Sequence, residues 1–112
     1  MEKGVTKMDL TTMNGFQLAA SVKSKYPDKG NNLVSPTLGL CCKAGELSQV
    51  VKDIVDVQDG DISSADIQTI SCLVSVAAFH LACICEETDI NMLEVCKKLI
   101  EDMKTPEPDK ES

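Results

Sequence analysis

Apolar residues recur at helical spacing in four segments of this chain, and turn-forming residues separate the segments. The most regular segment follows Ser35 and Pro36, which are typical of a helix N-cap and a first helical position. Its apolar positions come at steps of four, three, four and three: Leu40, Ala44, Leu47, Val51 and Ile54. We therefore predict a helix from about residue 36 to a turn at 56–64, where Gly60 would end it.

The segment 65–85 is apolar almost all round, and Ser63 or Ser64 would cap it. Such a helix must be surrounded, either by its own bundle or by another subunit, so we expect a homo-oligomer, a dimer or a tetramer. Its longest apolar stretch, 70–85, contains His80 and is shorter than the roughly 20 residues that a bilayer needs. We therefore expect a buried central helix and no contact with a membrane.

Two shorter helices complete the pattern. The first is predicted at about 12–24, before a turn at 25–32, and the last at 90–104 with Thr88 or Asp89 as its cap. Aromatic residues make up only 3% of the chain, which suits packed helices better than a β-sandwich. We expect an all-α fold, a four-helix bundle, in one domain.

The chain of 112 residues is long enough for one domain with a modest core. We place this domain at 11–104, between an N-terminal tail at 1–10 and a C-terminal tail at 105–112. The C-terminal tail is polar and holds two prolines, so we expect it to be disordered.

A net charge of -7 disfavours binding to DNA, RNA or anionic membranes, because a polyanion would be repelled. No stripe of basic residues with interleaved aromatics offsets this charge. Six cysteines are compatible with a disulfide scaffold, but the first ten residues lack the apolar core of a signal peptide. We expect a cytoplasmic protein with reduced cysteines that serve as small apolar residues.

Several short motifs follow one another in a suggestive order. Gln17 precedes the turn "KYPD" (25–28), and the next helix reads "GLCCKAGELSQVVK" (39–52). Leu81-Ala82 and "INMLEV" (90–95) close the series. In this order the motifs resemble the MazG-like all-α nucleoside triphosphate pyrophosphohydrolases over residues 11–104. The resemblance implies a MazG-like bundle that is completed by oligomerisation, and a nucleotide as its ligand.

The chemistry of that family needs two pairs of carboxylates on facing helices, which hold Mg²⁺ against the phosphates. Glu46 matches the second acid of the first pair, but Lys43 stands in place of the first. The third helix has no acid between Ile67 and Cys85, and a shifted register reaches Asp66 alone. We expect no cofactor; if hydrolysis survives, Mg²⁺ would be held weakly by Glu46 and Asp66.

Four residues are candidates for contacts with a nucleotide: Gln17, Lys43, Glu46 and Lys52. Lys43 could meet a phosphate in place of a metal, with help from Lys52 two turns further on. The plainer alternative for Lys43 and Glu46 is a solvated pair worth about 0.3 kcal/mol. Gln17 could contact a base or only support packing. His80, the only histidine, is more typical of a core or interface residue than of a catalyst.

Three functions follow, in order of preference. The first is a catalytically degenerate MazG-like protein that sequesters or senses a phosphorylated nucleotide without hydrolysing it. The second is an Mg²⁺-dependent nucleoside triphosphate pyrophosphohydrolase with a rearranged metal site. The third is a helical interaction protein that binds no nucleotide.

Overall fold

The computed structural model describes residues 12–104, and this part of the chain is helical without any strand. It contains four helices: α2 (Met13–Lys23), α3 (Val34–Asp56), α4 (Ser64–Glu87) and α5 (Met92–Lys104). The predicted all-α class is confirmed. The predicted tails at 1–10 and 105–112 lie outside the described residues, as does residue 11 of the predicted domain.

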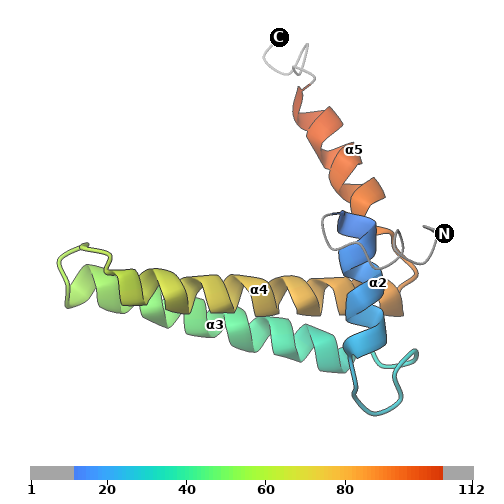
Figure 1. The fold of residues 1–112 in the computed structure, drawn as a ribbon, viewed down its shortest axis with the longest axis horizontal. Coiled ribbons are helices and arrows are strands. Elements are labelled where there is room, and N and C mark those ends of the chain that lie inside the picture. The colour runs from blue at the N-terminus through green and yellow to red at the C-terminus, as the bar shows by residue number, and fades with distance from the viewer. Residues whose placement is uncertain (1–11, 105–112) are drawn as a thin grey trace, which may run out of the picture.

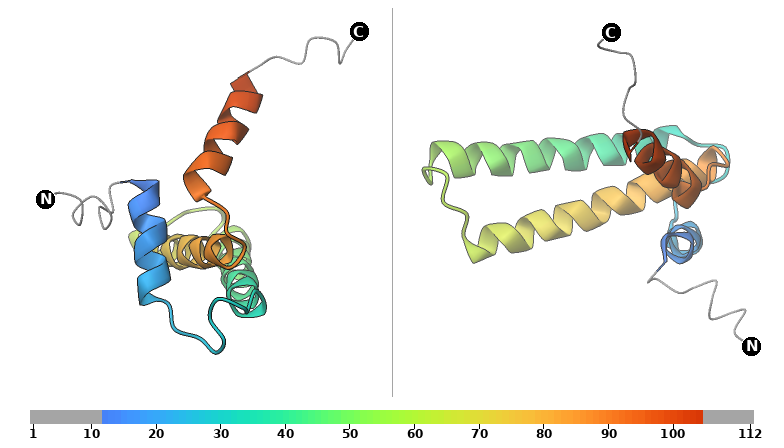
Figure 2. Two further views of the ribbon diagram at one scale, coloured as in Figure 1. Left: turned by 90° about the vertical axis from the view of Figure 1, so that its right-hand side faces the viewer. Right: turned by 90° about the horizontal axis from the view of Figure 1, so that it is seen from above.

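The two longest helices, α3 and α4, form an antiparallel hairpin (Figures 1 and 2). Ile54 and Leu73 are buried between helices whose inward positions recur at alternating steps of three and four. The turn after α3 uses positive φ angles at Asp59 (58°) and Gly60 (85°), and the Gly60 N–H donates to the carbonyl of Ile54 at 2.8 Å. Gly60 therefore lies in the chain reversal, as predicted, although α3 itself ends four residues earlier.

Helix α2 crosses one end of the hairpin, and α5 extends away from it (Figures 1 and 2). The core at the crossing is small: Ala20 of α2 packs with Ala82 and Cys83 of α4. Four partly buried residues surround this cluster: Phe16, Tyr26, Phe79 and Met92. In a single copy, the four helices do not close into a bundle, since α5 packs mainly against α2 and has no buried residue.

The helix caps agree with the predictions at one end of the hairpin only. Ser63 caps α4 in a capping box with Asp66, whose carboxylate accepts the Ser63 N–H at 2.9 Å. Ser35 is not a cap, because α3 begins at Val34 and the side chain of Asn32 accepts the Ser35 N–H instead.

The predicted cap of α5 was also wrong. Thr88 ends α4 by donating its hydroxyl to the carbonyl of Ile84, and Asp89 adopts a positive φ of 59° in the turn. These roles leave neither residue at the start of α5. The side chain of Asn91 instead accepts the N–H of Glu94, in the manner of an N-cap.

Helix α4 has 24 residues, so it is longer than the apolar stretch seen in the sequence. By length and composition it could cross a membrane, a test that the core helices of soluble proteins also pass. Only 17% of its most apolar 18-residue stretch is buried. The expected buried central helix is therefore largely uncovered in a single copy of the described chain.

All six cysteines are free and lie on helices. Cys83 is fully buried in the core, and this burial raises the pKa of its thiol. Cys41, Cys42 and Cys72 are exposed, which differs from the packing role that their apolar surroundings predicted. The cysteines of the hairpin thus contribute more to its surface than to its core.

Candidate functional site

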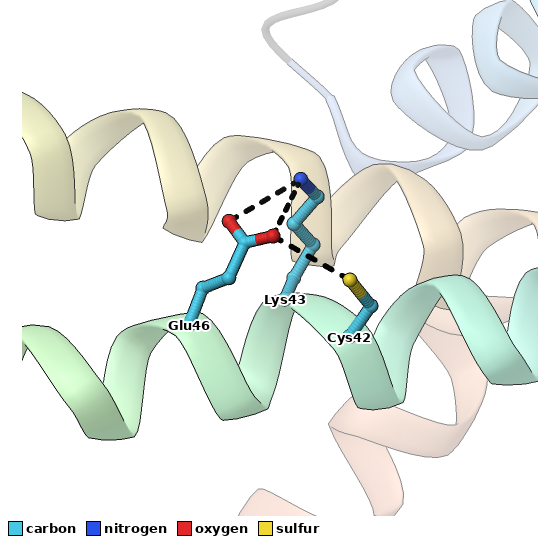
Figure 3. Close-up of polar contacts among 3 residues, drawn as sticks. All are labelled: Cys42, Lys43 and Glu46. Carbon is cyan, nitrogen blue, oxygen red and sulfur yellow. Dashed lines mark hydrogen bonds and ion pairs between the residues drawn. The ribbon is translucent and has the colours of Figure 1, made fainter.

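Lys43 and Glu46 form an ion pair on α3, with 3.4 Å between the ammonium nitrogen and the carboxylate (Figure 3). The thiol of Cys42 also lies 3.4 Å from this carboxylate. The side chains of Lys43 and Glu46 are 29% and 47% exposed, so water screens the pair. The described geometry is that of an ordinary pair one helical turn apart.

The part of α4 that faces this pair is apolar. Gly39 of α3 meets the ring of His80, and because the helices run antiparallel, Glu46 is level with Leu73 and Lys43 with Val76. No acidic residue of α4 stands opposite Glu46. Within residues 12–104, no three His, Cys, Asp or Glu side chains come together in a group suited to a metal ion.

Lys52 and Asp66 lie farther along the hairpin, and each has a local partner. Lys52 pairs with Asp56 at 2.8 Å on the exposed surface of α3. Asp66 caps α4 and also accepts a hydrogen bond from Gln58 at 2.8 Å. Its hydrogen bonds with the backbone N–H of Ser63, then with Gln58, lower the pKa of its carboxyl. The structure therefore does not bring Asp66 and Glu46 together.

Gln17 is 5% exposed, and its amide joins three segments of the chain. Its Nε2 donates to the carboxylate of Glu86 at 2.8 Å and to the carbonyl of Ile90 at 2.7 Å. Its Oε1 accepts the N–H of Met92 at 2.8 Å. Gln17 therefore has the packing role that was one of its two predicted alternatives, because its hydrogen bonds hold the α4–α5 turn against α2.

A pocket of about 410 Å³ lies where the α2–α3 loop meets the start of α3 and the inner side of α4. Basic, hydroxyl and aromatic side chains line it together, and none of the nine lining residues is acidic: Lys23, Ser24, Lys25, Tyr26, Ser35, Pro36, Phe79, His80 and Cys83. The pocket begins two turns before Lys43 along α3. It is the candidate functional site.

One side of the pocket is electropositive in a strongly acidic protein. Neither Lys23 nor Lys25 forms an ion pair with any residue between 12 and 104, whereas Lys43, Lys52, Lys98 and Lys104 each do. Helix α3 has no acidic residue in its first turn to offset its positive end. The two lysines thus bring positive charge to the pocket, whereas the N-terminus of α3 lies beside the Glu87 carboxylate, which accepts the Asn32 N–H.

The other side of the pocket is aromatic. The rings of Phe79 and His80 are 5.9 Å apart at an interplanar angle of 68°. A Cβ atom on Gly39 would lie 2.5 to 2.8 Å from three ring atoms of His80, so only glycine allows the ring to lie against α3. The lack of a side chain at Gly39 therefore sets the position of the His80 ring in the pocket.

Glu87 holds the loop that carries Lys25 and Tyr26. Its carboxylate accepts the Tyr26 hydroxyl at 2.5 Å and the backbone N–H groups of Gly30 and Asn32 at 2.7 and 2.9 Å. These bonds, first that of Tyr26, lower the pKa of the Glu87 carboxyl. Burial, and then the Glu87 carboxylate, raise the pKa of Tyr26. The loop is thereby tied to the end of α4.

The sequence did not point to this site, because its residues come from positions 23–36 and 79–83. Lys23 and Lys25 look like ordinary surface charges, and His80 looks like a core residue. Comparison of the chain with models of protein families, with curated proteins and with solved structures found no match. The resemblance to the MazG-like pyrophosphohydrolases stays a prediction.

Proposed function

We propose that this protein binds a phosphorylated nucleotide in the pocket between the α2–α3 loop and α4, and that it sequesters or senses the nucleotide without hydrolysing it. The observation that carries the proposal is that two lysines without ion-pair partners in residues 12–104 share one pocket of about 410 Å³ with an aromatic wall. This volume lies in the range of about 300 to 1,000 Å³ that is typical of small-molecule sites.

The chemistry of the two sides matches the two ends of a nucleotide. The phosphates bind beside the ammonium groups of Lys23 and Lys25. The base lies against Phe79 and His80, since aromatic rings favour flat partners. Ser35 also lines the pocket, and its hydroxyl can donate to the ligand because it already accepts from the side chain of Asn32.

Binding without hydrolysis follows from the residues around Glu46. One exposed carboxylate that is paired with Lys43 is a poor ligand for Mg²⁺, which needs several oxygen ligands. The facing surface of α4 supplies Leu73 and Val76, and Asp66 serves as a cap elsewhere. The protein would therefore release the nucleotide without having hydrolysed it.

The test is one incubation of the protein with a pool of linear and cyclic nucleotides and Mg²⁺, followed by filtration and then heating of the retained protein. We expect one nucleotide to be depleted from the filtrate and released intact on heating. A monophosphate with pyrophosphate in the filtrate would overturn the proposal in favour of the hydrolase. An unchanged pool would overturn it in favour of a protein without nucleotide binding.

Variants of the pocket make the test specific. Lys23→Gln and Lys25→Gln should each weaken retention about tenfold, since a hydrogen bond to a charged group is worth about 1.5 kcal/mol. Lys97→Gln changes the net charge equally but lies on α5, away from the pocket. Equal losses in all three variants would show that net charge, and not the pocket, governs retention.

A further inference from the structure

The pocket between the α2–α3 loop and α4 carries a small positive charge. Lys23 and Lys25 line it, and neither forms an ion pair within residues 12–104. Tyr26 and Cys83 stay neutral at neutral pH, because burial raises the pKa of both side chains. His80 is the remaining ionisable residue of the lining. The two lysines are therefore the permanent charges that a ligand meets.

Only a few side-chain donors of this region are left for an anion. Lys29, on the same loop, donates its ammonium to the carbonyls of Ser21 and Ser24 and does not line the pocket. The Ser24 hydroxyl donates to the Ser21 carbonyl at 3.2 Å. The Ser35 hydroxyl accepts a hydrogen bond from a neighbouring side chain and keeps its own proton to donate. Apart from the aromatic wall, three side-chain donors thus remain: Lys23, Lys25 and Ser35.

Negative charge stands directly behind one lining residue. The Tyr26 hydroxyl donates to the Glu87 carboxylate at 2.5 Å. The hydrogen bonds of Glu87, first that of Tyr26, lower the pKa of its carboxyl, so Glu87 is charged at neutral pH. The charge of Glu86 also acts on Tyr26. These carboxylates, in a chain of net charge -7, repel any ligand charge that the two lysines do not balance.

The pocket also offers no protein ligand to the Mg²⁺ that accompanies nucleoside polyphosphates. Mg²⁺ is usually held by carboxylates together with the phosphates, and none of the lining residues is acidic. On α3, the carboxylate of Glu46 points to the ammonium of Lys43 (Figure 3). A di- or triphosphate would therefore gain nothing from its metal in this pocket and would bring surplus negative charge.

Building on the function proposed above, we propose that the pocket selects nucleoside 5′-monophosphates over di- and triphosphates. A phosphate monoester carries a charge of about −1.5 to −2 at neutral pH and presents three acceptor oxygens. Its charge matches the two ammonium groups of Lys23 and Lys25, and its three oxygens match the three remaining donors. Such a ligand binds without a metal.

The aromatic wall distinguishes a nucleotide from other phosphate monoesters. Phe79 and His80 line the pocket together with the lysines, and their rings are 5.9 Å apart. A sugar phosphate or inorganic phosphate would meet the lysines but would leave these rings without a flat partner. Ribose 5-phosphate should therefore bind at least about tenfold more weakly than the nucleotide. Equal binding would assign the pocket to phosphate monoesters in general and would contradict the selection of a nucleotide.

The main test is calorimetric titration of the full chain with the four ribonucleoside 5′-monophosphates and the matching triphosphates, each in Mg²⁺ and in EDTA. We expect at least one monophosphate to bind about tenfold more tightly than its triphosphate, and equally well in both buffers. A triphosphate that binds as tightly, or a monophosphate that needs Mg²⁺, would overturn the selection and leave the proposed function in place. If none of these nucleotides binds, the selection is also overturned, and the pool experiment above decides the proposed function separately.

The charge of the ligand provides a second readout. The last proton of a phosphate monoester has a pKa of about 6, so the affinity should fall by up to about tenfold from pH 7.5 to pH 5. The 3′,5′-cyclic monophosphate of the same base keeps one charge over this range. It therefore reports any titration of the pocket itself, above all of His80. A constant ratio of the two affinities would refute the match between the dianion and the two lysines.

Lys25→Gln tests the same match from the protein side. With one lysine left, the preference for the 5′-monophosphate over the cyclic monophosphate should fall several-fold. Lys97→Gln, on α5, is the matched control and should keep the preference. If circular dichroism shows that Lys25→Gln is unfolded, Lys23→Gln takes its place. An unchanged preference in a folded lysine variant, or an equal fall in Lys97→Gln, would overturn the proposal.

Discussion

The hydroxyl of Tyr26 donates a hydrogen bond of 2.5 Å to the carboxylate of Glu87, although 60 residues separate the two in sequence. Glu87 ends α4, and the same carboxylate accepts two backbone N–H groups of the α2–α3 loop, from Gly30 and Asn32. Lys29 of this loop donates to the carbonyls of Ser21 and Ser24. The loop is thus held at both ends while it presents Lys25 and Tyr26 to the pocket.

The stability of the fold should fall in acid because of Glu87. Its pKa is lower in the folded chain than its ordinary value of 4.5, so its contribution is present above pH 4.5 and is lost as the pH falls through the folded pKa. We expect Glu87→Gln to be less stable than the wild type near neutral pH and to lose less between pH 6 and pH 3. Urea unfolding across this range measures both effects. Glu94→Gln on exposed α5 is the control, and parallel profiles for all three proteins would contradict the role of Glu87.

Gln17 should matter for stability and not for the ligand. Gln17→Leu removes the partners of Glu86, the Ile90 carbonyl and the Met92 N–H at a buried position. We expect the free energy of unfolding to fall by about 2 kcal/mol. Gln49→Leu, at an exposed position of α3, should change it by about 0.5 kcal/mol or less. Equal effects in chemical denaturation would speak against the fastening role of Gln17.

Two glycines of α3 should respond oppositely to alanine. At Gly39 the new Cβ meets the His80 ring at 2.5 to 2.8 Å, so Gly39→Ala should lower the free energy of unfolding by about 1 to 3 kcal/mol and weaken retention of the ligand. At Gly45 nothing lies within 4 Å, so Gly45→Ala should raise it by up to about 1 kcal/mol through helix propensity. Denaturation midpoints decide this, and a stabilised Gly39→Ala would refute the close contact.

The pair Lys43–Glu46 should prove weak and separate from the pocket. A double-mutant cycle with Lys43→Gln and Glu46→Gln should give a coupling free energy of about 0.5 kcal/mol or less, because both side chains are partly exposed. Both single variants should retain the nucleotide like the wild type. Pyrophosphate release that disappears in Glu46→Gln would instead establish the hydrolase.

The helices could be predicted because their signals are local. The spacing of apolar residues predicted helix α3, and Ser63 was predicted as a cap of α4. Both signals involve only neighbouring residues, and the structure contains the helix and the cap. The caps predicted at Ser35 and at Thr88 or Asp89 were wrong because both helices begin at other residues: Asn32 accepts the Ser35 N–H at the start of α3, and Asn91 accepts the Glu94 N–H at the start of α5. Where two polar residues compete for one helix end, spacing alone does not choose between them.

The sequence by itself determined the all-α class and the four helices. It also determined that Glu46 is the one acid left of the expected carboxylate pair on α3. These features depend only on residue type and short spacing. Only the tertiary structure brought Lys23 and Lys25 to His80, because the packing of α2 across α4 joins segments that lie more than fifty residues apart. It also decided that the Gln17 amide is hydrogen-bonded at both of its ends and that most of the apolar surface of α4 is uncovered within the described residues. Which face of a helix is buried depends on what packs against it, and no local pattern contains that partner.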